Sequence, residues 1–118
     1  LETMMFLANT LLPAMRDWFY ADKDGEPAGA AAVTDLARRR IEGAWERLDG
    51  MLADGRPHLL GELSTADFLA MMLMRWSRNM PKPATEWPHL AAYIARMAAM
   101  PSFQEVNARE ALSPWPPA

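Results

Sequence analysis

The sequence predicts an all-α protein of about five helices. Apolar residues recur at spacings of three and four along most of the chain, no stretch alternates apolar and polar residues with a period of two, and prolines and glycines separate the periodic stretches. The chain has 118 residues, of which 51% are hydrophobic and 23% are charged, as is typical of one globular domain with a single core. We therefore treat residues 1–118 as one domain.

Two helices are predicted in the N-terminal half of the chain. The first covers residues 2–20, and Pro13 predicts a kink between Asn9 and Pro13, because proline removes one backbone hydrogen bond. Residues 22–29 are polar and rich in helix breakers, which predicts an exposed loop. The second helix covers residues 30–54. Its expected buried stripe consists of Val33, Leu36, Ala37, Ile41, Ala44, Leu48, Met51 and Leu52.

A complete helix start precedes the most apolar segment of the chain. Ser64 is the expected N-cap, and Asp67 follows three residues later, so that each side chain can accept the backbone N–H of the other in a capping box. Leu63 and Phe68 are placed to form the hydrophobic staple that accompanies such a box. The helix that follows, residues 65–78, is apolar on every side in its first two turns. We therefore expect it to be the central helix, surrounded by other helices, and Asp67 to be structural rather than catalytic.

Prolines set the limits of the last two predicted helices. Pro88 suits the first turn of a helix that ends before Pro101, and Pro101 opens a short helix over residues 102–111. Phe103 and Val106 are expected to face the core. Residues 113–117 contain too many prolines to be helical.

Composition and spacing exclude several classes of function. The chain has no cysteine, and its 12 basic and 15 acidic residues give a net charge of -3, so it has no basic surface for nucleic acid. Its longest apolar run, residues 68–74, is far shorter than the roughly 20 residues that span a bilayer. No residues have the spacing of a metal site, and no secretion signal is recognisable, so we expect a cytoplasmic protein without a metal. Because the first residue is Leu1, we expect the stretch to be cut from a longer chain.

Three groups of residues together resemble a known family. The first is the glycine and capping box before the apolar helix, and the second is an aromatic-Pro-x-Leu helix start with a later Pro-x-Phe. The third is an Arg-Trp pair late in the apolar helix. The residues are Gly61-x-Leu63-Ser64-x-Ala66-Asp67, Trp87-Pro88-His89-Leu90 with Pro101-Ser102-Phe103, and Arg75-Trp76. In this order they resemble the C-terminal helical domain of the glutathione S-transferase superfamily, and bacterial beta-class-like members in particular.

The resemblance implies an orthogonal bundle of about five helices that forms one half of a two-domain enzyme. In such proteins a thioredoxin-like N-terminal domain, which we expect to be absent from this chain, binds most of the glutathione and activates its thiol. The helical domain lines the pocket for the second substrate and contributes to the dimer. We therefore expect the intact protein to be a homodimeric glutathione transferase, which conjugates glutathione to hydrophobic electrophiles in the detoxifying manner of the family. Glutathione would be a co-substrate, with no cofactor and no catalytic residue in this chain.

The candidate pocket residues are Met5, Asn9, Leu12 and Trp76. The first three share a helical face, their positions match those that line the cleft in bacterial relatives, and Trp76 would face them. The chain departs from the beta-class pattern at Met5, where asparagine is common, and at Leu12-Pro13, where relatives have a His-Lys pair that helps to hold glutathione. We therefore expect an apolar pocket floor. Each of these residues also has a purely structural interpretation, as core or as a partner of backbone groups near Pro13.

The rival hypothesis is a non-catalytic member of the superfamily, because the same helical fold serves as a protein-interaction module. The presence or absence of an upstream thioredoxin-like segment would discriminate between the enzyme and the module.

Overall fold

The computed structural model describes residues 2–24, 27–109 and 115, and within these residues the chain is helical and contains no strand. The α-helices are α1 (Glu2–Phe6), α2 (Leu12–Asp24), α3 (Pro27–Leu52), α4 (Thr65–Trp76), α5 (Pro88–Ala98) and α6 (Pro101–Arg109). A π-helical segment, Leu7–Leu11, joins α1 to α2, and the 3-10 turns Ser77–Asn79 and Ala84–Glu86 lie between α4 and α5. The predicted all-α fold class is confirmed.

The disturbance predicted near Pro13 takes the form of the π-helical segment. The N–H of Leu12 donates to the carbonyl of Leu7, five residues back instead of four. The helical turn directly before the proline is therefore wider than an α-helical turn. Pro13 has no N–H to offer to the carbonyl of Asn9, and a wider turn accommodates that loss without ending the helix. The first helical stretch therefore continues, in three consecutive segments, as far as Asp24.

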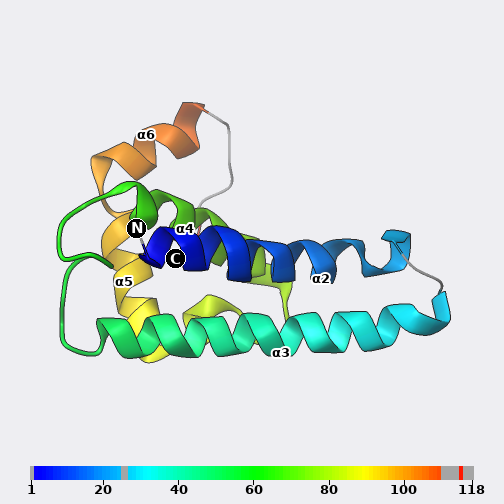
Figure 1. The fold of residues 1–118 in the computed structure, drawn as a ribbon. Coiled ribbons are helices and arrows are strands. Elements are labelled where there is room, and N and C mark those ends of the chain that lie inside the picture. Colours follow the sequence, from blue (N-terminus) through cyan, green and yellow to red (C-terminus); the bar gives the residue numbers. More distant parts are fainter. Residues whose placement is uncertain (1, 25–26, 110–114, 116–118) are drawn as a thin grey trace.

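The prediction of a loop over residues 22–29 is wrong in its extent. Helix α2 continues through Asp24 and α3 begins at Pro27, so only residues 25 and 26, which lie outside the described part, separate the two helices. Proline is compatible with the first turn of a helix, where its missing N–H has no intrahelical partner to lose. The two helices lie antiparallel and side by side (Figure 1).

The stripe predicted along α3 is buried in only part of its length. Ile41, Leu48 and Leu52 are buried, whereas Val33 and Leu36 are 44% and 47% exposed, which corrects the expectation for these two residues. Figure 1 shows the reason, because the first half of α3 and the second half of α2 extend beyond the rest of the bundle. An apolar stripe at that end has only α2 to cover it.

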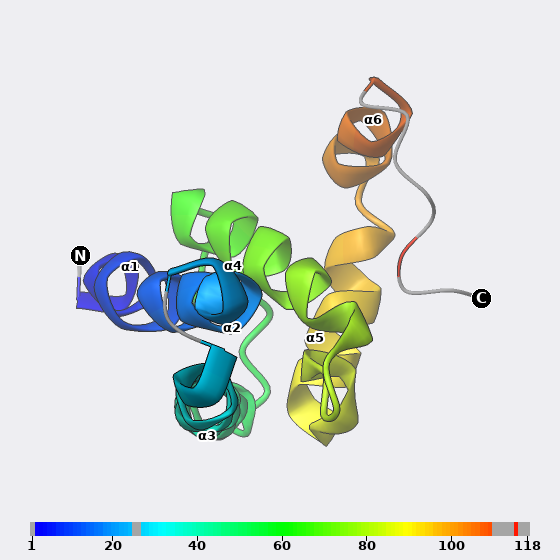
Figure 2. The ribbon, with the colours of Figure 1, turned by 90° about the vertical axis from the view of Figure 1, so that its right-hand side faces the viewer.

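Helix α4 lies between α2 and the α5–α6 pair, with α3 on the far side of α2 (Figure 2). One side of it is buried in the core, at Ala66, Ala70, Met71, Leu73 and Met74. The expectation that α4 is surrounded on all sides is wrong, because Phe68, Met72 and Trp76 are each 37% or 38% exposed. Their spacing of four places them in one line along the helix. Helix α4 is therefore central to the core and open along one line.

Helices α5 and α6 begin where prolines were predicted to place them, at Pro88 and Pro101. Helix α5 packs against α3 and crosses it steeply (Figure 1). In α6, Phe103 is half-buried, but Val106 is 43% exposed, so the expectation that Val106 faces the core is wrong. Of the tail, only Trp115 is described, and it is buried against the core. The prediction for the other residues of 113–117 lies outside the described part.

Candidate functional site

The predicted capping box at the start of α4 is present, with two unequal halves. The N–H of Ser64 donates to Asp67 Oδ2 at 3.0 Å. The Ser64 hydroxyl, in contrast, is buried and has no partner in good hydrogen-bond geometry among the described residues, although it faces the Asp67 N–H in the arrangement of a box. The Asp67 N–H is 3.1 Å from the Ser64 carbonyl. The carboxylate is therefore the stronger half of the box.

Asp67 is also the centre of a buried hydrogen-bond network. Its side chain is fully buried, and Oδ1 accepts hydrogen bonds from the Tyr93 hydroxyl at 2.5 Å and from the Leu59 N–H at 3.2 Å. Burial, and then the bond to Asp67, raise the pKa of Tyr93 well above its ordinary value. His58 Nδ1 lies 3.7 Å from Asp67 Oδ2. The carboxylate thus joins the connector before α4, the start of α4 and the middle of α5, and it lines neither of the two clefts described below.

The two residues predicted to form the hydrophobic staple are both partly exposed, Leu63 at 43% and Phe68 at 38%. The partner of Phe68 in the structure is Phe103 of α6, whose ring is stacked on it with a centroid separation of 4.8 Å and an interplanar angle of 15°. The aromatic pair ties the start of α4 to α6.

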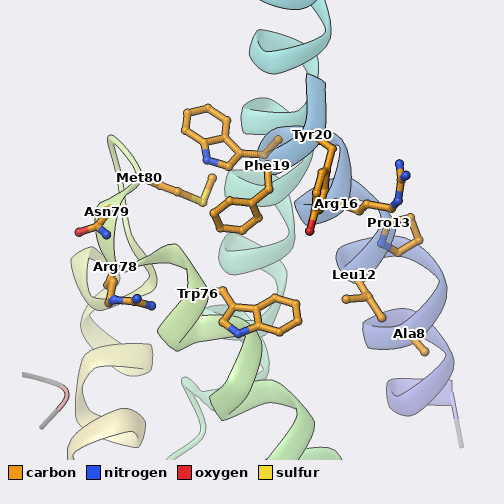
Figure 3. A pocket seen from close by; sticks show the side chains of 11 residues that line it. Ala8, Leu12, Pro13, Arg16, Phe19, Tyr20, Trp76, Arg78, Asn79 and Met80 are labelled. Carbon is orange, nitrogen blue, oxygen red and sulfur yellow. The ribbon is translucent and has the colours of Figure 1, made fainter. Parts of the chain in front are cut away.

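A cleft of about 1060 Å³ lies between α2 and the C-terminal end of α4, and it is the best candidate for a binding site. Its size is at the upper end of the range of roughly 300–1,000 Å³ that is usual for ligand pockets. Figure 3 shows Leu12, Phe19 and Tyr20 on α2 along one side, with Trp76 at the end of α4 opposite them. The lining residues are Ala8, Leu12, Pro13, Arg16, Trp18, Phe19, Tyr20, Trp76, Arg78, Asn79 and Met80.

The structure brings together two of the four residues that the sequence singled out. Leu12 and Trp76 line the cleft, whereas Met5, which is 53% exposed, and Asn9, which is also exposed, are not among its lining residues. The prediction that Met5, Asn9 and Leu12 share one face assumed a regular α-helix. The π-helical segment Leu7–Leu11 holds more residues per turn, so it rotates the residues before it relative to Leu12.

Sequence reasoning missed most of the residues that surround Leu12 and Trp76. Arg16, Phe19 and Tyr20 follow Leu12 by four, seven and eight residues, and continuing the helical face from Leu12 would have found them. Arg78 lies in the 3-10 turn Ser77–Asn79 after α4, and Met80 is the first residue after that turn. Helical periodicity carries no signal for such positions.

A second cleft, of about 570 Å³, runs along the open line of α4 toward α6. Phe68, Met72 and Trp76 contribute to it from α4, and the stacked Phe103 contributes from α6. Trp115 from the tail is also part of its wall. Trp76 and Arg78 border both clefts, so the end of α4 separates two neighbouring hollows.

Two further properties of the described residues bear on the kind of site. No group of three or more His, Cys, Asp or Glu side chains within the described part is arranged to hold a metal ion. None of the described helices combines the length and the apolar character that are needed to cross a bilayer.

Comparison with known protein families gives a match over most of the chain. The family model described as glutathione S-transferase, C-terminal domain, matches residues 10–110, a range that contains every lining residue of the larger cleft except Ala8. No curated protein and no solved structure matches the chain. Since the matched residues make up most of the 118 and the observed fold is all-α, the chain belongs to the family of glutathione S-transferase C-terminal domains.

Proposed function

We propose that this domain forms the electrophile-binding wall of a glutathione transferase, and that the cleft between α2 and α4 is the place where the hydrophobic co-substrate lies. The observation that carries the proposal is the meeting of Leu12 and Trp76 across one cleft, although they come from helices far apart in the sequence. In this proposal the intact protein conjugates glutathione to hydrophobic electrophiles. A separate thioredoxin-like domain binds most of the glutathione.

The chemistry of the cleft supports a role in binding and orientation. Conjugation needs a thiolate, because the thiol of glutathione, with a reference pKa near 8.5, is mostly protonated at neutral pH. The activating group is assigned to the other domain. Aromatic and aliphatic walls can hold an apolar electrophile within attack distance of the sulfur, and holding two reactants together removes much of the entropic barrier.

A homodimer is part of the same proposal. The projecting end of the α2–α3 pair exposes Val33 and Leu36 on α3, which lie outside both clefts. An apolar surface of this kind favours burial against another protein surface. Sedimentation of the intact protein measures the oligomeric state, and a monomer at micromolar concentration would contradict the dimer.

The test of the proposed function is a kinetic comparison on the intact protein with glutathione and 1-chloro-2,4-dinitrobenzene. We expect Trp76→Ala and Leu12→Ala to raise KM for the electrophile more than KM for glutathione, because both side chains line the cleft. Leu60→Ala is the matched control, since Leu60 is 47% exposed and lies outside both clefts. Equal changes in the two KM values would contradict the placement of the electrophile.

The non-catalytic interaction module is the outcome that replaces the enzyme if the intact protein neither binds glutathione nor turns over the electrophile. Glutathione affinity chromatography and the conjugation assay together decide between the two functions.

A further inference from the structure

Among the described residues, the charged side chains that line the cleft between α2 and α4 are all positive. Its charged lining residues are Arg16 and Arg78, and no carboxylate from the described part of the chain lines it. The chain as a whole carries a net charge of -3, so this local excess of positive charge does not follow from composition. The smaller cleft has the same character, because Arg75 and Arg78 are its charged lining residues.

Arg78 is the residue best placed to use its charge on a ligand. It is exposed and lies in the turn directly after α4, on the same side of the cleft as Trp76 (Figure 3). Its Nη1 donates to the Arg75 carbonyl at 3.2 Å, and it forms no ion pair with any carboxylate of the described residues. A guanidinium has five N–H donors, so several remain for an acceptor in the cleft.

Arg16 adds a second positive charge and fixes an aromatic wall. Its guanidinium carbon lies 5.3 Å from the centre of the Tyr20 ring, a cation–π distance, and it has further interactions. Trp18, Phe19 and Trp76 supply other aromatic surfaces of the same cleft. The lining therefore combines flat apolar faces with a positive rim.

From this combination, and resting on the proposed function, we infer that the cleft selects electrophiles that are aromatic and negatively charged, such as aryl carboxylates. Aromatic side chains stack on a planar ring, and a guanidinium binds a carboxylate with two parallel hydrogen bonds. A neutral aromatic compound of the same shape would gain the stacking without the charged contact. In this inference, Arg78 is the residue that distinguishes the charged from the neutral aromatic compound.

Binding of two matched unreactive compounds to the full-length protein tests the inference. The pair is 3,5-dinitrobenzoate and 1,3-dinitrobenzene, which differ only in the carboxylate, measured by calorimetry with saturating S-methylglutathione so that the glutathione site is filled. We expect the carboxylate to bind about fivefold or more tightly than the neutral compound, as a partly exposed charged hydrogen bond would give. The preference should shrink at high salt, because ions screen exposed charges.

Charge variants identify the responsible residue. Arg78→Gln should lower the affinity for 3,5-dinitrobenzoate several-fold more than that for 1,3-dinitrobenzene, so that most of the preference is lost. Arg109→Gln is the matched control, because it removes the same charge from an exposed position of α6 outside both clefts. Equal melting temperatures of the two variants and the wild type would show that neither change acts through folding.

A reactive pair extends the test to conjugation. In 4-chloro-3,5-dinitrobenzoate and 1-chloro-2,6-dinitrobenzene the thiolate sulfur of glutathione forms a bond to the carbon that bears chlorine. Chloride leaves with the electron pair of the C–Cl bond, and the thiol proton passes to solvent. We expect Arg78→Gln to lower kcat/KM for the carboxylate relative to that for the neutral compound.

The possible failures point to different causes. If neither unreactive compound binds the wild type, both the proposed function and this inference are wrong. If both bind equally, or if the preference appears only without S-methylglutathione, the electrophile site stands and its selection of anions is wrong. If Arg109→Gln reduces the preference as much as Arg78→Gln does, the effect belongs to the net charge of the protein and the inference is overturned.

Discussion

The starts of helices α4 and α5 solve the same problem in different ways. The first turn of a helix has backbone N–H groups without intrahelical partners, and a nearby acceptor must satisfy them. At α4 the acceptors lie within the local sequence, in the capping box of Ser64 and Asp67. At α5 the residue before the helix is Trp87, which has no side-chain cap, and Asp49 of α3 accepts the N–H groups of His89 and Leu90 at 2.8 and 3.0 Å.

The difference teaches which part of a helix start can be recognised before the fold is known. The box at α4 is a pattern of neighbouring residues, whereas the cap of α5 comes from some 40 positions away and exists only because α3 and α5 pack together. The two starts are also connected, because Tyr93 of α5 donates to Asp67. A change at Asp67 therefore acts on both helices, and a change at Asp49 acts on α5 and its contact with α3.

Asp67→Ala should have the largest effect, with a loss of about 2 to 4 kcal/mol in the free energy of unfolding, because two buried donors and one partly buried donor lose their acceptor. Urea denaturation of the chain measures this loss. Asp35→Ala is the control, since Asp35 makes ion pairs along the surface of α3 and its removal should cost much less than that of Asp67. A loss at Asp67 no larger than that of the control would show that the network does not hold α4.

Tyr93→Phe should cost about 1.5 to 2 kcal/mol, because it removes one donor from a buried carboxylate that keeps its two backbone partners. The raised pKa of Tyr93 gives the cost a pH dependence. Above about pH 10 the tyrosine of the unfolded chain ionises while that of the folded chain does not, so stability falls. The difference between wild type and Tyr93→Phe should therefore be fully present below pH 10 and decrease above it, and a constant difference from pH 8 to 11 would contradict this origin.

Asp49→Ala should cost about 1 kcal/mol, which is the usual value of a helix cap. Amide hydrogen exchange at His89 and Leu90 should become faster, while exchange in the first turn of α4 stays unchanged. Glu46→Ala, an exposed acidic residue one turn earlier on α3, is the control and should leave both unchanged. Faster exchange at α4 as well would mean that the two starts are not independently capped.

Ser64→Ala should have the smallest effect, about 0.5 kcal/mol, the low end for an N-cap serine. Its hydroxyl lacks a well-formed hydrogen bond, and the backbone N–H of Ser64 still reaches Asp67 in the variant. Thermal unfolding of Ser64→Ala and Asp67→Ala compares how much the serine hydroxyl and the aspartate carboxylate of the capping box each stabilise the protein. Equal losses would show that the serine hydroxyl does cap α4.

The residues of the larger cleft fall into the same two groups. Some are indicated by the local sequence pattern, and others are brought to the cleft only by packing. Leu12 and Trp76 were singled out because one lies on an apolar helical face, the other lies late in an apolar helix, and the resemblance to the family places such residues at the cleft. Met5 and Asn9 belong to that face only in a regular α-helix, and the π-helical segment places them outside the cleft. Arg78 could not be recognised from the sequence, since its position depends on how the turn after α4 sits beside α2.

By itself, the sequence determined the helical character of the chain, the starts of α4, α5 and α6, and the family to which the chain belongs. These depend on hydrogen bonds and steric limits within a few neighbouring residues, or on the order of motifs along the chain. The tertiary structure alone decided the cap from Asp49, the open line of Phe68, Met72 and Trp76, and the side chains that share the larger cleft. Burial and long-range hydrogen bonds depend on which surfaces meet, and a helical period tells which residues share a face but not what lies opposite that face.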